Sequence, residues 1–255
     1  QEERLLLSTL AGDQGVTLMA GNTLLAEGAQ VTSAEGRIGV SASEVTIKDA
    51  RQQTTDRDAE KTRQGKTKRQ REMETVRETS TGSTFSGQQG VTAIAREGDA
   101  TVMGSTLHSG QGDIVLAAKE DVTLTSATES ESRFSESRAK SKGFMKKSSS
   151  HTVTDERMTT EKGALLSGET VRLQAGNDLL IHGSSVAASG DVALAAGNNV
   201  TVEAATNTAS NYSLHEKKKS GVFSGGSGFG VTVGSQSSKT VRDGAQTTQS
   251  DARSL

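Results

Sequence analysis

The chain has 255 residues, a formal net charge of −2 and no cysteine, which excludes a disulfide framework and a thiolate metal site. Leu, Ile, Val and Phe make up about 18% of it, below the level of roughly 20% at which disorder is considered. Disorder of that origin usually comes with a high net charge, which is missing here, and no apolar run approaches the length of a membrane span. A chain this poor in large apolar residues can fold if each one stacks on a copy of itself, so internal repeats are the feature to expect.

Three segments of the chain, residues 20–50, 97–127 and 175–205, can be laid over one another. Val45, Val122 and Val200 correspond in this alignment, which gives a long period of about 77–78 residues. A shorter period lies inside each segment: the sequence AGND at 175–178 returns as AGNN at 196–199. This shorter period of about 20 residues is typical of leucine-rich repeats and of parallel β-helices.

The short period favours the parallel β-helix, because the Leu-x-x-Leu-x-Leu skeleton is missing and short Val-x-Val or Val-x-Leu pairs take its place. Alternation along a strand predicts that Val200 and Val202 point inward while Thr201 points outward. Stacked coils would form apolar columns, and Asn177 and Asn198 would form an internal amide ladder. The sequence therefore predicts an all-β fold, a right-handed parallel β-helix with coils of about 21 residues, in one repeat-solenoid segment over 1–255.

We place the coils at residues 1–50, 90–127 and 164–206. Polar inserts follow them at 51–89, 128–163 and 207–251. Their compositions differ while the long period stays constant, which favours a fixed structure such as a β-hairpin that leaves the helix and returns. Turns are expected near Gly65, Gly143 and Gly225–Gly228. The alternative for residues 58–78 is a helix, which would have no apolar face to bury.

The sequence offers little for catalysis or for a cofactor. Four histidines occur without a second ligand at metal spacing, and no Gly-x-Ser-x-Gly nucleophile motif is present. The glycine-rich stretch 225–230 lacks the spacing, the strand and the helix of a phosphate-binding loop. We therefore expect no enzyme activity, no cofactor, no metal and no nucleic-acid partner.

Basic and aromatic residues gather in the inserts and form the candidate contact surface. All six aromatic residues fall outside the predicted coils, where the fold does not need them. Exposed lysines beside aromatic rings would suit contact with an anionic membrane or a surface receptor. The alternative, which is the more frequent one, is that a run of charged residues only forms a face exposed to water. The candidate residues are Lys142, Phe144, Lys146, Lys147, Lys217, Lys218, Lys219, Phe223 and Phe229.

Two stretches carry a family resemblance: AGNDLLIHGSSVAASGDVALAAGNNVTVEAATNTASNYS at 175–213 and SGGSGFGVTVGSQSSKT at 224–240. They resemble the hemagglutinin repeats of filamentous hemagglutinin-type exoproteins, and most closely the second repeat region of the contact-dependent growth inhibition exoproteins. The resemblance covers essentially the whole chain through the weaker copies at 20–50 and 97–127. The Asn-Pro motifs of the family's secretion domain and its Val-Glu-Asn-Asn toxin boundary are absent, so we expect this chain to be a fragment.

The resemblance implies a structural segment of a filament that is secreted to the bacterial cell surface with the help of an outer-membrane transporter. It further implies a part in the passage of a toxin across the outer membrane of a target cell. The alternative that it leaves open is an adhesin module that binds host glycan or another cell surface.

Overall fold

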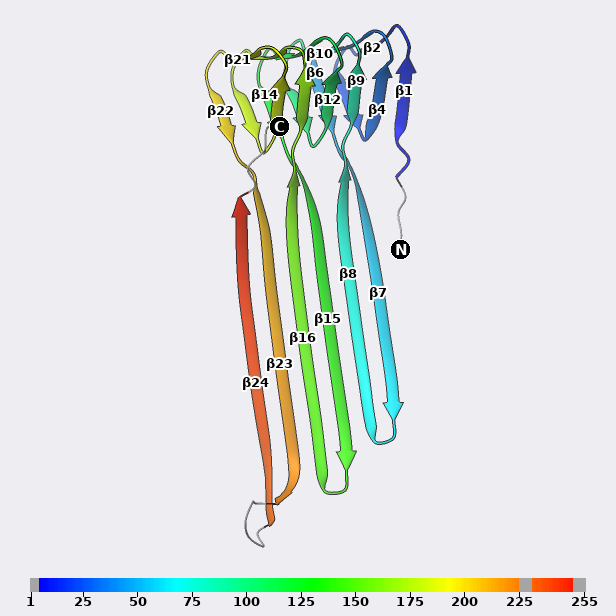
Figure 1. Ribbon diagram of the computed structural model, residues 1–255, viewed down its shortest axis with the longest axis vertical. Helices are drawn as coiled ribbons and strands as arrows, with labels where there is room; N and C mark the ends of the chain where they lie inside the picture. The colour runs from blue at the N-terminus through cyan, green and yellow to red at the C-terminus, as the bar shows by residue number, and fades with distance from the viewer. Residues whose placement is uncertain (1–4, 225–230, 250–255) are drawn as a thin grey trace.

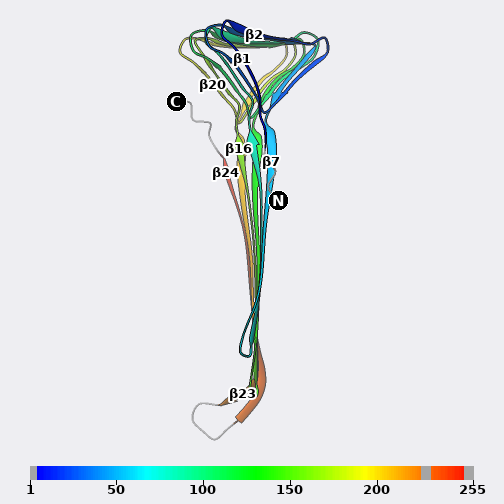
Figure 2. The ribbon, with the colours of Figure 1, turned by 90° about the vertical axis from the view of Figure 1, so that its right-hand side faces the viewer.

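The structure is a computed structural model that describes residues 5–224 and 231–249. Within these ranges the regular structure consists of 24 β-strands in four six-stranded sheets. Three of the sheets are parallel and wrap around a common core. The fourth is antiparallel and hangs from one corner of the other three, as Figures 1 and 2 show.

The three parallel sheets form a solenoid in which each of six coils contributes one strand to each sheet, which confirms the predicted parallel β-helix. Val16 pairs with Ile38 and Val171 pairs with Val192, so adjacent coils are offset by about 21 residues. The first sheet contains β1 (Ser8–Gly12), β4 (Ala29–Ser33), β9 (Thr84–Gly87), β12 (Thr106–Ser109), β17 (Leu165–Gly168) and β20 (Ser185–Ala188). The second contains β2 (Gly15–Met19), β5 (Arg37–Ala42), β10 (Gly90–Ala95), β13 (Asp113–Ala118), β18 (Val171–Ala175) and β21 (Val192–Ala196). The third contains β3 (Thr23–Glu27), β6 (Glu44–Lys48), β11 (Ala100–Met103), β14 (Val122–Thr125), β19 (Leu179–His182) and β22 (Val200–Glu203).

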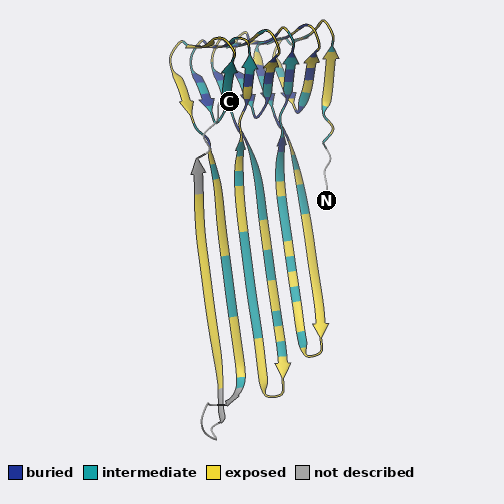
Figure 3. Ribbon diagram, viewed as in Figure 1, coloured by how far each residue is buried: buried dark blue, intermediate teal, exposed yellow. Residues whose placement is uncertain are grey.

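The core consists of apolar columns that run along the solenoid axis. Figure 3 shows that the buried residues are concentrated in the coils. In the third sheet, Ile47, Val102 and Leu124 stack on one another and are fully buried. Because every inward residue packs on its equivalent in the next coil, small aliphatic side chains suffice to exclude water. This stacking explains how a chain with few large apolar residues folds.

Phe85 corrects two of our expectations about the first insert. It lies in β9, is fully buried, and pairs with Val31 on one side and Leu107 on the other. The first insert therefore ends before β9 and not at residue 89, and Phe85 is a core residue and not a free aromatic. The reason is that the coil resumes immediately after the hairpin, where the sequence TGST at 81–84 is as polar as the insert itself.

Val200 and Val202 are exposed although they occupy positions that face inward in other coils. Both lie in β22, at the end of the third sheet, and pair only with β19 within the described part of the chain. Their exposed fractions are 48% and 68%, because no further coil covers them there. An inward-facing position is buried only where coils stack on both of its sides.

The predicted ladder of Asn177 and Asn198 is replaced by a ladder of carboxylates. The Asp121 carboxylate accepts hydrogen bonds from the backbone N–H of Asp178 and the side-chain amide of Asn177, each at 2.9 Å. Asp178 in turn accepts from the backbone N–H of Asn199 at 3.0 Å. These corners are partly exposed to solvent. A charged carboxylate there stays solvated while it accepts a hydrogen bond from an amide of the next coil.

The third corner of the solenoid is the connection from a strand of the third sheet to the next strand of the first sheet. Along the chain this connection is alternately a tight turn and a hairpin. In the coils without a hairpin the turn is made by a glycine at a φ between 52° and 57°. A Cβ on each glycine would collide with the Cβ of an alanine in the following coil, at the residue where the hairpin leaves or just before it. The glycines are Gly28, Gly104 and Gly183, and their partners are Ala50, Ala127 and Ala205.

All three described inserts are antiparallel β-hairpins, so the helix considered for residues 58–78 was wrong. The hairpins consist of β7 (Ala50–Gln64) with β8 (Thr67–Thr81), β15 (Ala127–Gly143) with β16 (Lys146–Lys162), and β23 (Thr206–Ser224) with β24 (Val231–Gln249). Two-residue turns at Gly65 and directly after Gly143 confirm two of the expected turn positions. The third, Gly225–Gly228, lies outside the described residues.

The hairpins pair with one another and form a single sheet, which we call the hairpin sheet. β8 pairs with β15 through twelve residues of each strand, and β16 pairs with β23 in the same antiparallel manner. Strands in a sheet lie about 4.8 Å apart, so a two-stranded hairpin is about 9.6 Å wide. Two coils of the solenoid rise by the same distance, and the hairpins therefore meet because every second coil carries one.

Candidate functional site on the hairpin sheet

The hairpin sheet has two faces of different composition. Residues paired across antiparallel strands share a face, and alternate residues along a strand point to opposite faces. Phe134, Asp155 and Tyr212 lie in one such row and define what we call the aromatic face. Lys217 and Lys219 lie on the opposite face. Strands of 15, 17 and 19 residues carry both faces roughly 50–65 Å from the solenoid.

The structure divides the predicted lysines between the two faces. Lys142, Lys147 and Lys218 come together on the aromatic face with Lys140, which the candidate surface did not include. They border an open hollow of about 500 Å³ that is also lined by serines of β16, β23 and β24. No carboxylate lines this hollow among the described residues, and none of the four ammonium groups is in a described ion pair.

The remaining candidates do not join this cluster. By alternation Lys217 and Lys219 point to the opposite face, where they line a hollow of about 230 Å³ together with Arg69; Lys218 and Lys219 border both hollows. Phe144 is 89% exposed in the turn of the second hairpin, and Lys146 is exposed in the first position after that turn. Phe223 belongs to β23, but its side chain, like all of Phe229, lies outside what the structure describes.

An apolar patch on the aromatic face was missed by the sequence reasoning. Val153, Leu214 and Val241 lie side by side on β16, β23 and β24, and Phe134 and Tyr212 occupy the next row toward the solenoid. Val241 is 49% exposed, and the two aromatic rings are more than one third exposed. Alternation within each insert indicates which of these residues share a face of their own hairpin. Only the pairing register between the hairpins shows that they lie side by side.

Ion pairs link the row that contains Val153 of the apolar patch to the next row toward the lysines. His151 Nε2 lies 2.6 Å from the Glu136 carboxylate, which also accepts from Arg138 Nε at 2.7 Å. Burial raises the pKa of Glu136, but the hydrogen bonds from His151 and Arg138 outweigh it and hold the pKa below its usual value. Glu136, which lies beside Val153 of the patch, is thus paired with two basic side chains of the same face.

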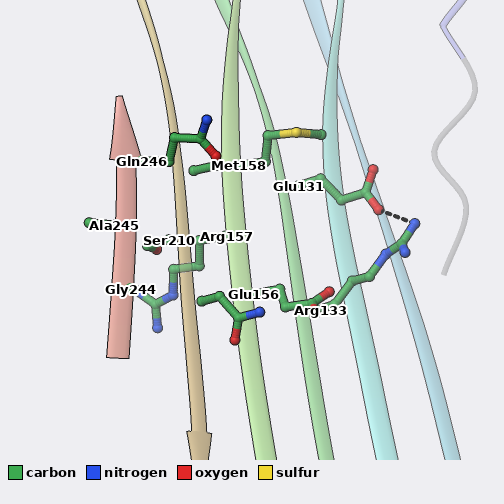
Figure 4. A pocket seen from close by; sticks show the side chains of 11 residues that line it. Glu131, Arg133, Glu156, Arg157, Met158, Ser210, Gly244, Ala245 and Gln246 are labelled. Atoms are coloured by element: carbon green, nitrogen blue, oxygen red, sulfur yellow. Dashed lines mark ion pairs between the residues drawn. The ribbon is translucent and has the colours of Figure 1, made fainter. Parts of the chain in front are cut away.

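A second hollow, of about 510 Å³, lies nearer to the solenoid and involves mainly residues of the opposite face (Figure 4). Its floor is made by small residues, Ala209 and Gly244. Glu131 forms ion pairs with Arg133 at 2.6 Å and with Arg77 at 3.0 Å. Burial raises the pKa of Glu131, and these two arginines lower it further than burial raises it. Glu131 is thus held between two arginines at the edge of this hollow.

The described residues contain no cluster of three or more His, Asp or Glu side chains that could hold a metal ion. They also contain no helix long and apolar enough to cross a membrane.

A parallel β-helix that carries a hairpin on every second coil defines a repeat scaffold of the kind found in secreted surface filaments. The model of the hemagglutinin repeat family matches residues 64–146 and 143–253, and the chain belongs to this family. The first match begins at the turn of one hairpin and ends at the turn of the next, while the second begins at that turn and extends past the end of β24. Proteins with these repeats are secreted exoproteins of the bacterial cell surface.

The chain is similar to several curated exoproteins. It is 49% identical over 140 residues to the 16S rRNA endonuclease CdiA of Enterobacter cloacae, and 45% identical over 146 residues to the tRNA nuclease CdiA of Yersinia mollaretii. It is 40% identical over 171 residues to the deoxyribonuclease CdiA of Dickeya dadantii. These alignments cover 55%, 57% and 65% of the chain, which spans only 4 to 5% of the length of these relatives. Among solved structures, none matches the chain.

Proposed function

We propose that this segment is a non-catalytic part of a contact-dependent growth inhibition filament that takes part in moving a toxin across the outer membrane of a target cell. The segment supplies a stiff rod and a broad sheet that projects from it. The family match and the similarity to exoproteins named CdiA support the filament. The observation that carries the more specific proposal is the hairpin sheet, because a mere spacer would not need a projecting sheet.

The names of the relatives support the view that this segment and the nuclease activity belong to different regions of the long proteins. Three relatives that share this segment are named for action on 16S rRNA, on tRNA and on DNA. Because the named substrate changes while the segment remains similar, nuclease activity belongs elsewhere in those proteins. In the same scheme the outer-membrane transporter is a partner of the full-length protein, and the target-cell surface is a partner of this segment.

The predicted contact residues have a defined place in this proposal. Lys142, Lys147 and Lys218 would contact the target-cell surface, with Lys146 and Phe144 at the tip of the second hairpin. Repetition of the same surface along the rod would make weak contacts additive. An adhesin module would use the hairpins differently, because it would fix the cells together and would not act on the toxin.

The experiment replaces each of the three hairpins in a full-length exoprotein by the short Gly-Ser corner found at Gly104–Ser105. We expect normal display on the producing cell and normal capture of target cells, but loss of growth inhibition. Unchanged inhibition would show that the segment is a spacer. Loss of target-cell capture with intact display would favour the adhesin alternative.

A further inference from the structure

The aromatic face brings together two features that are separate in the sequence. One is the apolar patch of Phe134, Val153, Tyr212, Leu214 and Val241, and the other is the lysine cluster of Lys140, Lys142, Lys147 and Lys218. Both span several strands from different hairpins, so neither exists unless the hairpin sheet has assembled. We propose that the aromatic face is a docking surface for a bilayer that carries phosphate-bearing anionic lipids. This inference deepens the proposed function, on which it rests.

The apolar patch fits the interfacial zone of a bilayer. Leu214 is directly opposite Val153 and Val241, and Tyr212 lies two residues from it on the same face. Tyrosine combines an apolar ring with a polar hydroxyl and is favoured where hydrocarbon meets headgroups. Neighbouring exposed apolar residues mark an interaction site more often than isolated ones do.

The lysine cluster fits the phosphates of the same bilayer. Lys218 lies four residues from Leu214 along β23, a distance of about 14 Å, so patch and cluster can touch one membrane surface together. Each lysine near an anionic surface contributes about 1 kcal/mol of attraction. The serine hydroxyls of the hollow, such as Ser149 and Ser220, can donate hydrogen bonds to phosphate oxygens.

Several carboxylates on this face are paired with cations, whereas Glu72 and Asp243 are in no described ion pair and lie nearer to the solenoid than the lysine cluster. Arg57 neutralises Glu74 at 2.7 Å, and Arg157 neutralises Asp155 at 3.2 Å. Lys239 lies 3.8 Å from Glu216. The lysine cluster is thus the largest group of unpaired charge on the aromatic face within the described residues.

The opposite face has cations but, among the side chains that the structure describes, no matching patch. Lys217, Lys219 and Arg69 gather there, while its exposed large apolar side chains, Met73 and Met158, are on strands that do not adjoin. A soluble polyanion would need only the charges and could use either face. The coincidence of patch and cluster on one face therefore favours an amphiphilic surface over a free polymer.

The test is co-flotation of this chain with vesicles of phosphatidylcholine alone or of phosphatidylcholine with phosphatidylglycerol. The charge variant changes Lys140, Lys142, Lys147 and Lys218 to Ser. Its matched control changes Arg69, Arg71, Lys217 and Lys219 to Ser on the opposite face. We expect the first variant to lose roughly tenfold or more in affinity for anionic vesicles and the control to lose much less.

A second pair of variants tests the patch. Tyr212→Ser with Leu214→Ser should also weaken binding to anionic vesicles, while Met73→Ser with Met158→Ser on the opposite face should not. Thermal unfolding and sedimentation of all four variants check that each remains folded and in the same association state.

Several outcomes would overturn the inference: no binding by the parent chain, equal losses from both charge variants, or no loss from the patch variant. A dimer of the parent that the patch variant dissociates would show that a second copy covers the patch instead. If vesicle binding fails while removal of the hairpins still abolishes growth inhibition, the proposed function stands and this inference falls.

Discussion

At the scale of single residues, the corner between the third and the first sheet depends on glycines whose replacement causes both backbone strain and a steric clash. Gly104 has a φ of 52°, and a Cβ added there would lie 2.5 Å from the Cβ of Ala127. Backbone strain and a steric collision therefore act at the same place. The equivalents Gly28 and Gly183 repeat the arrangement, so each glycine sets the distance to the coil that carries the next hairpin.

We predict that Gly104→Ala destabilises the fold by about 1–3 kcal/mol. The matched control is Gly39→Ala in β5, where a Cβ would meet nothing within 4 Å. That substitution should be neutral or should stabilise by up to about 1 kcal/mol, because alanine has less backbone freedom to lose. Thermal unfolding of both variants tests this difference. Equal melting temperatures would contradict the requirement for glycine at residue 104.

Two carboxylates of the hairpin sheet make its stability depend on pH. The pKa values of Glu131 and Glu136 are lower in the folded chain than the usual value for glutamate. A depressed folded pKa gives stability that is complete above the unfolded pKa and is lost as the pH falls through the folded pKa. We expect the sheet to lose stability in this acidic window, and the variant Glu131→Gln with Glu136→Gln to be less stable at neutral pH and to depend less on acid. Melting curves across the acidic range would refute this if both chains lost stability in parallel.

At the scale of elements, the alternation of strands separates buried from exposed neighbours. Val102 in β11 is fully buried between Ile47 and Leu124, while Thr101 points outward beside Thr46 and Thr123. Val102→Asp should therefore destabilise the solenoid by about 3 kcal/mol or more, since it buries an unpaired charge. Thr101→Asp should cost less than about 1 kcal/mol. Chemical denaturation of the two variants measures the difference, and similar midpoints would show that the register is wrong.

The pairing of the hairpins changes what we expect for hydrogen exchange. From the sequence, residues 51–81 and 213–226 should exchange quickly, as free hairpins would. In the structure β8, β15, β16 and β23 have partners on both sides, so their amides should exchange slowly, almost as in the coils. Fast exchange should be confined to the edge strands β7 and β24 and to the turns. Rapid exchange throughout β15 and β16 would mean that the hairpins do not pair in solution.

The sequence predicted the coils, the hairpins and two turns, because these depend on local alternation and on the constant length of the repeat. It did not predict the apolar patch, because Val153 and Leu214 are brought together by the pairing of different hairpins. It also missed the role of Phe85, since a single aromatic residue beside a polar insert carries no periodic signal. Of the predicted contact residues, Lys142, Lys147 and Lys218 share one face, and the separation of Lys217 and Lys219 from them follows from alternation along β23.

At the scale of the whole molecule, the match between coil rise and hairpin width controls whether the hairpin sheet forms. Deletion of residues 123–200 removes one complete block of two coils and one hairpin, and should let β8 pair with β23. Deletion of residues 91–113 removes a single coil, and leaves the first two hairpins about 4.8 Å apart, too close for both to fit. Hydrogen exchange of β8 should remain slow in the first variant and become fast in the second. Slow exchange in both would show that the hairpins adapt to any spacing.

This match also limits how such a protein can grow by gene duplication. A copied segment of one coil, or of three, would leave a gap or an overlap in the hairpin sheet, while a copy of two coils with their hairpin would extend both structures in step. Selection for an unbroken sheet would therefore preserve only even-numbered additions of coils. The nearly constant spacing between Val45, Val122 and Val200 is the trace that such a filter would leave in the coding sequence.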